Sequence, residues 1–201
     1  MPVSTGRLVV AITGASGAPY AIRFLQEAAK LYHEVYVMMT EQASQVIAVE
    51  TGRSVTVNNA TSKSLLGADY PSIKFADRRN FFTPPASGSY RHDGMVIVPC
   101  SMGTASRIAA GTSDDLISRA ADVCLKERRR LIIVPRETPW SLIHLRNMVT
   151  LTEAGATILP AAPAFYHNPK TIDDLVDFVV ARILQQLDAP QSLVDEWQVE
   201  A

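Results

Sequence analysis

The sequence has little cysteine and no recognisable metal-binding pattern. Only two cysteines, Cys100 and Cys124, occur among 201 residues. They are too far apart for a CxxC motif and too few for a disulfide scaffold. The four histidines show no metal-ligand spacing, and the HExxH motif of zinc proteases is absent. These absences argue against a disulfide-rich secreted domain and against a metal site.

Neither charge nor hydrophobicity is concentrated in the chain. Lys and Arg number 19 against 20 Asp and Glu, and a net charge of −1 gives no global field for binding nucleic acid or an anionic membrane. No apolar run approaches the ~20 residues of a membrane span. The first residues lack the layout of a signal peptide. We therefore expect a cytoplasmic protein that binds neither nucleic acid nor membrane.

Short apolar runs alternate with helical patterns along the chain. Strand-like runs are predicted at residues 8–12, 35–39, 95–98, 131–134 and 157–159. Repeated strand–helix alternation implies right-handed crossovers and a mainly parallel sheet covered by helices on both faces. The sequence therefore predicts one three-layer α/β domain over residues 1–188. The tail, residues 189–201, is expected to dock on this domain or on a neighbouring subunit.

Three helix starts are predicted from capping residues. Ser113 is expected to cap a helix reaching about Arg129, and Thr138 to cap another with Pro139 in its first position. Thr171 opens a capping box before a helix over residues 172–187. Residues 173–177 match the DDxxD pattern of prenyl-diphosphate synthases, but acids in a first helical turn favour the helix dipole. We assign them to helix stability.

Small and hydroxylated residues follow the predicted strands, where ligands of open α/β sheets bind. Residues 13–18 and 100–104 each lead into a helix, whose free N–H groups can seat a phosphate. The first loop is not GxGxxG and lacks the Walker lysine, so the NAD and ATP signatures both fail. Either loop alone is equally well explained as a capped tight turn. Several such loops on one rim favour a nucleotide or flavin site.

Other polar residues allow two interpretations each. Arg119, Asp122 and Lys126 share one helix face, which favours an exposed salt-bridge stripe over a binding site. Glu137 is either a cap partner or an acid/base group. Glu50 lies near the end of its helix, where the dipole disfavours an acid, and functional sites tend to carry such mismatches.

An aromatic pair precedes a turn-rich loop. Phe81 and Phe82 stand just before residues 84–89, which are rich in proline, serine and glycine. The pair is interpreted as core in preference to a flap over a ligand.

Read together, these loops resemble a known family. The matching segments are residues 13–18, 84–89, 99–104, 119–123, 125–129, 134–139, 163–167 and 173–178. In this combination the chain is similar to the UbiX-type flavin prenyltransferases, once described as aromatic acid decarboxylases. The resemblance covers nearly the whole chain.

The resemblance implies a fold, a cofactor and a reaction. It implies a Rossmann-like or flavodoxin-like fold, FMN without a metal, and a homo-oligomeric dodecamer built from trimers with the flavin at a subunit interface. A dimethylallyl group would pass from dimethylallyl phosphate to N5 of reduced FMN, followed by ring closure onto the adjacent aromatic carbon. The product, prenylated FMN, would serve a UbiD-type decarboxylase.

The resemblance also implies the site residues. FMN would contact Gly14, Ala15, Ser16, Thr40, Ser101, Met102, Gly103, Thr104 and Arg136. The allyl phosphate would contact Arg119, Lys126, Tyr166 and Arg182. Ser16, Glu50 and Glu137 match polar positions near the reacting atoms, and Phe81 and Trp197 match aromatic positions near the prenyl group.

The chemistry is coherent with these residues. Cleavage of an allylic C–O bond leaves negative charge on phosphate, which Arg119, Lys126 and Arg182 can neutralise through charge-assisted hydrogen bonds. Aromatic faces can stabilise the allyl cation. Glu137 would protonate the departing phosphate, and Glu50 would help to remove the flavin ring proton.

Two other functions compete with this one. A flavin-dependent cysteine decarboxylase of the phosphopantothenoylcysteine type shares the fold, but its early active-site histidine and PxMNxxMW-like segment are not visible in this chain. A non-catalytic FMN carrier is the second alternative.

Overall fold

The computed structural model describes residues 6–195. Its centre is one parallel sheet of six strands in the order β3-β2-β1-β4-β5-β6. The strands are β1 Arg7–Ile12, β2 Glu34–Met39, β3 Ile73–Phe75, β4 Met95–Cys100, β5 Leu131–Pro135 and β6 Thr157–Ile158. Every neighbouring pair is parallel, as the strand–helix alternation predicts.

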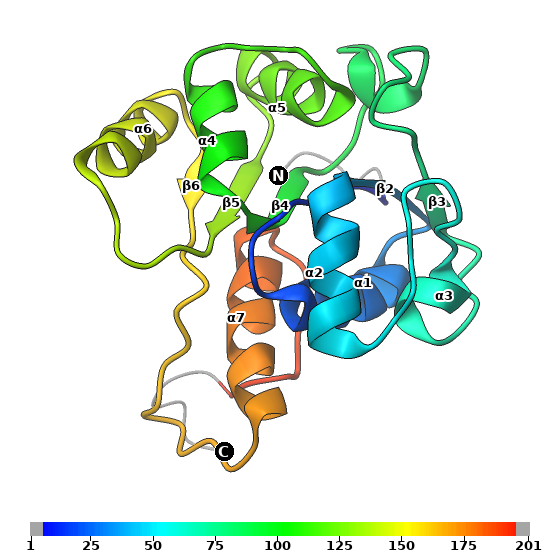
Figure 1. Ribbon diagram of the computed structural model, residues 1–201, viewed down its shortest axis with the longest axis vertical. Helices are drawn as coiled ribbons and strands as arrows, with labels where there is room; N and C mark the ends of the chain where they lie inside the picture. The colour runs from blue at the N-terminus through cyan, green and yellow to red at the C-terminus, as the bar shows by residue number, and fades with distance from the viewer. Residues whose placement is uncertain (1–5, 196–201) are drawn as a thin grey trace.

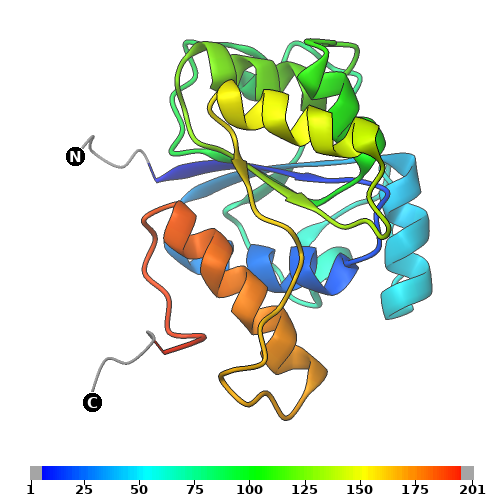
Figure 2. The same ribbon diagram turned by 90° about the vertical axis from the view of Figure 1, so that its left-hand side faces the viewer.

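Helices cover both faces of this sheet (Figures 1 and 2). One layer holds α1 Ala18–Leu31, α2 Glu41–Thr51, α3 Ser62–Leu66 and α7 Ile172–Gln186. The other holds α4 Met102–Ala109, α5 Leu116–Lys126 and α6 Leu142–Glu153. Figure 2 shows α7 in orange and α1 in blue on one side of the strands, with the green and yellow helices on the opposite side. The predicted three-layer α/β sandwich is confirmed.

The core consists of two apolar clusters separated by the sheet. Along β1, Leu8, Val10 and Ile12 face α1 and α7, whereas Val9 and Ala11 face α4 and α5. Because both faces are buried, the strands read as continuous apolar runs in the sequence. That property made them visible without a structure.

The order of the strands reverses beside β1. From β1 the chain crosses through α1 to β2, and from β4 it crosses on the other face through α4 and α5 to β5. Neighbouring loops therefore diverge beyond the carboxyl ends of β1 and β4. In open α/β sheets this is where ligands bind.

Two predicted helix starts are wrong. α5 begins after Asp115 instead of Ser113, because the Asp115 carboxylate accepts from Ser118 N at 2.9 Å and Ser118 Oγ accepts from Asp115 N. α6 begins after Ser141 instead of Thr138, with Ser141 Oγ accepting from His144 N at 3.2 Å. In both places a second capping residue further along the chain forms the reciprocal box.

The capping box at Thr171 is confirmed. Thr171 Oγ1 accepts from Asp174 N, and the Asp174 carboxylate accepts from Thr171 N at 2.9 Å and Lys170 N at 2.7 Å. These backbone N–H groups lower the pKa of Asp174. Asp177 pairs with Arg23 of α1 at 2.5 Å. The DDxxD residues thus stabilise α7 and its packing, as the sequence predicts.

The division between domain and tail at residue 188 stays a prediction. Ala189 and Leu193 pack against the core on the α1 and α7 side. Within residues 6–195 no helix combines the length and apolar character needed to cross a membrane.

Candidate functional site

Thr13 ties together the two loops at the strand reversal. Its buried hydroxyl donates to Pro99 O at 2.9 Å and accepts from Ser101 N at 2.7 Å. The backbone N–H of Thr13 also donates to Pro99 O, at 3.2 Å. The loops after β1 and β4 are therefore fixed relative to each other within one chain. Thr13 was not predicted as a site residue, although its place directly before the small-residue loop was the available signal.

The amino end of α4 opens onto this junction. Ser101 Oγ accepts from Thr104 N at 3.3 Å and lies 3.0 Å from Thr104 Oγ1. Gly103 is exposed, and a Cβ at this position would touch nothing within 4 Å. Met102 is buried beneath it. This end of the helix therefore offers backbone N–H groups to a ligand without a covering side chain.

The β2 strand brings Thr40 to the same edge. Thr40 caps α2 by accepting from Ala43 N at 3.1 Å, and its own N–H donates to Ile12 O at 3.1 Å. Gly14 lies so close to α2 that an added Cβ would come within 2.4 Å of Gln42 Cβ. Only glycine permits this approach of the β1 loop to α2.

Glu50 caps a helix that is not its own. The cap position of α1, Gly17, has φ 126° and no side chain to accept a hydrogen bond. The Glu50 carboxylate, from the end of α2, accepts from Gly17 N at 3.0 Å and Ala18 N at 2.8 Å. The positive end of the α1 dipole stabilises the Glu50 carboxylate, whereas the negative end of the α2 dipole would disfavour it. The mismatch at Glu50 in the sequence is explained by this contact.

Arg136 and Glu137 extend the same rim from β5. Arg136 Nε donates to Ser16 O at 3.3 Å, which joins the β5 loop to the exposed Ser16. Glu137 Oε1 accepts from Thr138 N at 3.0 Å, and Glu137 O accepts from Trp140 Nε1 at 2.7 Å. All nine residues predicted to contact FMN therefore lie in loops or helix starts at one edge of the sheet. We call this edge the FMN rim.

Of the two cations on α5, Lys126 lies apart from that rim. Arg119 Nε donates to Ala86 O at 3.2 Å, and Arg119 Nη1 pairs with Asp122 at 2.8 Å. Lys126 pairs with Glu127 and remains 46% exposed. The last turn of α5 directly precedes β5, so Lys126 lies toward the amino edge of the sheet, opposite the FMN rim. The expected salt-bridge stripe is present for Arg119 and Asp122 but does not include Lys126.

The remaining predicted donor contacts lie on the other face. Arg182, on the outside of α7, donates to Gln185 Oε1 at 2.6 Å. Tyr166 is 57% exposed and lies edge-on to Phe178 of α7, with ring centroids 5.8 Å apart. Since α5 and α7 cover opposite faces (Figure 2), one chain does not bring together the four residues predicted to bind the donor.

Phe81 and Phe82 are not part of the core. Phe81 is 42% exposed and Phe82 100% exposed, so the interpretation of this pair as core is wrong. They lie in the segment after β3, whose following residues 84–86 pack on α5. Trp197 lies outside the described residues.

Cys100 is unsuited to nucleophilic chemistry despite its place beside Ser101. Burial raises the pKa of its thiol to about 12, so the thiol stays protonated at neutral pH. Burial likewise raises the pKa of Cys124 to about 12. Within residues 6–195, no three His, Cys, Asp or Glu side chains form a group able to hold a metal ion.

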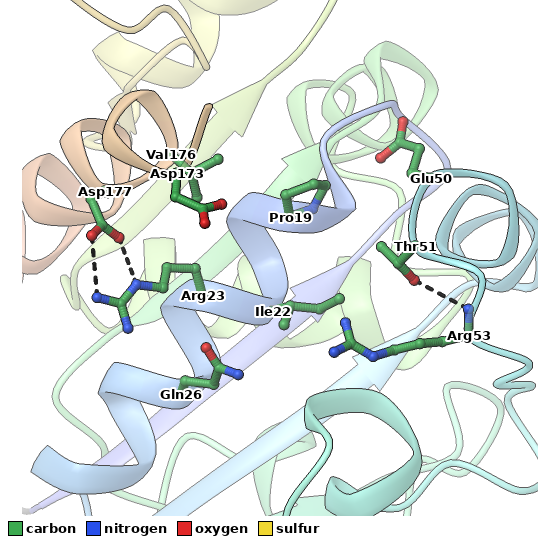
Figure 3. Close-up of a pocket in the computed structure, with 10 residues that line it drawn as sticks. All are labelled: Pro19, Ile22, Arg23, Gln26, Glu50, Thr51, Arg53, Asp173, Val176 and Asp177. Carbon is green, nitrogen blue, oxygen red and sulfur yellow. Dashed lines mark hydrogen bonds and ion pairs between the residues drawn. The ribbon is translucent and has the colours of Figure 1, made fainter. Parts of the chain in front are cut away.

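A groove of about 570 Å³ lies beside Glu50, between α1, α2 and α7 (Figure 3). Figure 3 shows the charged side chains of Arg23, Arg53 and Asp177 along it. Arg23 is held by Asp177 at 2.5 Å and by Glu27 at 2.6 Å. Within the groove, Arg23 and Asp177 therefore neutralise each other. The sequence patterns did not predict this groove.

Comparisons with known proteins find similar flavoproteins. The flavoprotein family profile matches residues 3–184. A flavin prenyltransferase UbiX from Halalkalibacterium halodurans is 48% identical over 200 residues, covering 100% of this chain and 97% of the relative. A UbiX crystallised with FMN and dimethylallyl pyrophosphate superposes with a TM-score of 0.86 at 44% identity, covering 97% of this chain and 98% of the other. A dodecameric FMN-dependent UbiX-like decarboxylase from Escherichia coli superposes at 0.84 with 39% identity, covering 96% and 100%.

Proposed function

This chain belongs to the flavoprotein family and, within it, to the UbiX-type flavin prenyltransferases, and from that membership we propose that it transfers a dimethylallyl group from dimethylallyl phosphate to reduced FMN. The group would be attached at N5 and at the adjacent ring carbon. The observation that carries the proposal is the convergence of the β1, β2, β4 and β5 loops on one edge of the sheet.

The residues at this edge fit a flavin mononucleotide. The close approach of Gly14 to Gln42 and the uncovered amino end of α4 leave backbone N–H groups available to phosphate or ring oxygens. Arg136 adds a positive charge beside Ser16. We assign FMN binding to Gly14, Ala15, Ser16, Thr40, the residues 101–104 and Arg136. Reduced FMN supplies the nucleophilic ring atoms when bound.

The protein's own part in the transfer is mainly electrostatic. Arg119, Lys126 and Arg182 would neutralise the leaving phosphate, with Tyr166 as a hydrogen-bond donor. Glu137, beside the FMN rim, would protonate that phosphate. These cations take the place of a metal ion in the proposed reaction.

Glu50 has a more constrained part. Its carboxylate accepts from Gly17 N and Ala18 N, so it is held next to Ser16 at the FMN rim. We propose that Glu50 and Ser16 together move the proton of the flavin ring. Phe81 and Trp197 are assigned to the prenyl group.

The proposed reaction requires more than one copy of the chain. The donor-binding residues lie on α5 and beside α7, on opposite faces of the sheet, so they can surround one phosphate only if different subunits contribute them. α6 exposes Leu142, Ile143, Leu145 and Val149, an apolar surface suited to self-association. We propose an assembly of trimers in a dodecamer, in the cytoplasm, that passes prenylated FMN to a UbiD-type decarboxylase.

Anaerobic incubation with reduced FMN and dimethylallyl phosphate tests this function. Mass spectrometry should detect a flavin heavier by one prenyl group. A parallel reaction with dimethylallyl pyrophosphate shows whether the donor is the monophosphate. Unchanged FMN would favour a carrier, and decarboxylation of a cysteine-containing substrate would favour the cysteine decarboxylase.

A further inference from the structure

His167 has a buried imidazole without a hydrogen-bond partner. Neither Nδ1 nor Nε2 is accessible, and neither has a partner among residues 6–195. Buried polar groups in folded proteins nearly always have one, because leaving such a group unpaired is unfavourable. At least one ring nitrogen of any histidine carries a proton, so the side chain has a donor to offer.

The imidazole is held firmly between two aromatic rings. It stacks on Phe178 with ring centroids 5.2 Å apart and planes inclined by 8°. Tyr166 lies edge-on to it at 5.9 Å and 80°, and edge-on to Phe178 at 5.8 Å and 85°. We call Tyr166, His167 and Phe178 the three-ring cluster. Its packing fixes the orientation of the imidazole without a hydrogen bond to either ring nitrogen.

The three-ring cluster rests on the helix face that carries Arg182. Asp174, Phe178 and Arg182 follow one another at intervals of four residues, so they lie on one side of α7. Asp174 is already engaged, because its carboxylate accepts from Lys170 N and Thr171 N. Its pKa is lowered first by these backbone hydrogen bonds and only last by His167. Asp174 is therefore not the hydrogen-bond partner that the imidazole lacks.

We propose that His167 is a further binding residue for the phosphate of the allyl donor, alongside Tyr166 and Arg182. This inference rests on the proposed function. A phosphate oxygen accepts from an imidazole N–H, which would satisfy the buried donor. Tyr166 lies edge-on to the imidazole and is itself 57% exposed, and the proposal requires its ring to turn aside so that the phosphate reaches the imidazole.

Replacing the nitrogens while keeping the ring isolates the polar role. In His167→Phe the stack on Phe178 is retained but the donor is lost, whereas His167→Asn keeps a donor without the ring. The matched control is His33→Phe, at an exposed histidine beside Gly6 before β1. Prenyl transfer is measured against dimethylallyl phosphate concentration, with inorganic phosphate as a competitive inhibitor.

We expect His167→Phe to raise the KM for dimethylallyl phosphate and the inhibition constant of inorganic phosphate by about tenfold. The dissociation constant of FMN should not change, and His167→Asn should recover part of the loss. Unchanged phosphate constants in His167→Phe would overturn the inference. Equal losses in both variants, together with a smaller assembly, would also overturn it and assign the imidazole to a contact between subunits.

Phosphate binding distinguishes a failure of the proposed function from a failure of this inference. If the unmodified protein makes no prenylated flavin, calorimetric titration with inorganic phosphate still compares it with His167→Phe. Weaker phosphate binding by the variant supports the role of His167, and equal binding contradicts it.

Discussion

The two halves of the candidate site are built in different ways. At the FMN rim, the loops after β1, β4 and β5 are joined by hydrogen bonds through Thr13 and Arg136 within one chain. The cations proposed to bind the donor are Arg119 and Lys126, held by local ion pairs on α5, and Arg182, on the outer surface of α7. On the proposed assignment, the hydrogen bonds of the first half are complete within the single chain, whereas the second half would require assembly.

The strongest test of this difference is to prevent assembly. Ile143 is 67% exposed on α6, and a charge introduced at a buried interface is strongly unfavourable. We expect Ile143→Asp to dissociate the oligomer and to reduce prenyl transfer by roughly 100-fold or more, because whole donor contacts are lost. FMN affinity should fall much less than prenyl transfer, because the loops of the FMN rim are joined within one chain even though the resemblance implies a flavin next to a neighbouring subunit.

Light scattering, fluorescence titration with FMN and the transfer assay measure the three quantities, with Ile143→Leu as the apolar control. A loss of FMN affinity as large as the loss of transfer in the dissociated Ile143→Asp protein would contradict a rim whose loops are held together within one chain.

Removing one cation separates binding from transfer without dissociation. Lys126→Ala should slow prenyl transfer by roughly 100-fold, since a charge-assisted contact to the leaving phosphate is lost. Its FMN affinity should match that of the unmodified protein, because Lys126 lies away from the rim. A neighbouring exposed arginine provides the control, as Arg128→Ala. Transfer at the original rate would remove Lys126 from the donor site.

A substitution at the FMN rim should weaken FMN binding and leave donor binding largely unchanged. Thr13→Val keeps the shape of the side chain but leaves Ser101 N and Pro99 O without the hydroxyl. FMN binding should weaken by about tenfold, in line with the loss of buried hydrogen bonds. Thr13→Ser should restore it. Assembly and the KM for dimethylallyl phosphate should change little. A larger effect on either of them than on FMN binding would contradict the separation of the site into two halves.

The smallest effect on the site is expected at the amino edge of the sheet. Burial lowers the pKa of His92 to about 4, well below the ordinary value of about 6.5 for a histidine. Between pH 6.5 and 4 the unfolded chain therefore binds a proton that the folded chain does not. Stability is greatest above this window and falls as the pH decreases, by on the order of 3 kcal/mol in total.

In His92→Gln this contribution to the pH dependence should vanish, while transfer at pH 7 should be unaltered. Urea unfolding at several pH values measures the effect. An unfolding free energy equally dependent on pH in both proteins would assign the dependence to other groups.

The sequence predicts the buried parts of the fold better than the exposed ones. The strands β1, β2, β4 and β5 are covered on both faces, so each is visible as an apolar run. β3 spans only Ile73–Phe75 at the edge of the sheet, which is too short to leave a pattern. The starts of α5 and α6 were misplaced because two capping residues compete in each segment.

The candidate site divides in a similar way. The rim could be predicted because parallel strands place their following loops together. The contact of Glu50 with α1 joins residues more than 30 positions apart, so no local pattern shows it. Lys126 and Arg182 are separated because α5 and α7 cover opposite faces of the sheet. A resemblance in sequence does not state which subunit provides each residue.

Mixing two inactive variants tests the central claim most directly. Lys126→Ala and Arg182→Ala subunits are unfolded together, refolded with FMN and assayed for prenylated flavin beside each variant refolded alone. If α5 of one subunit and α7 of another surround the same phosphate, some mixed sites contain both cations, and activity should reappear. Mixed assemblies that form, bind FMN and remain as inactive as the separate variants would contradict a donor site shared between subunits.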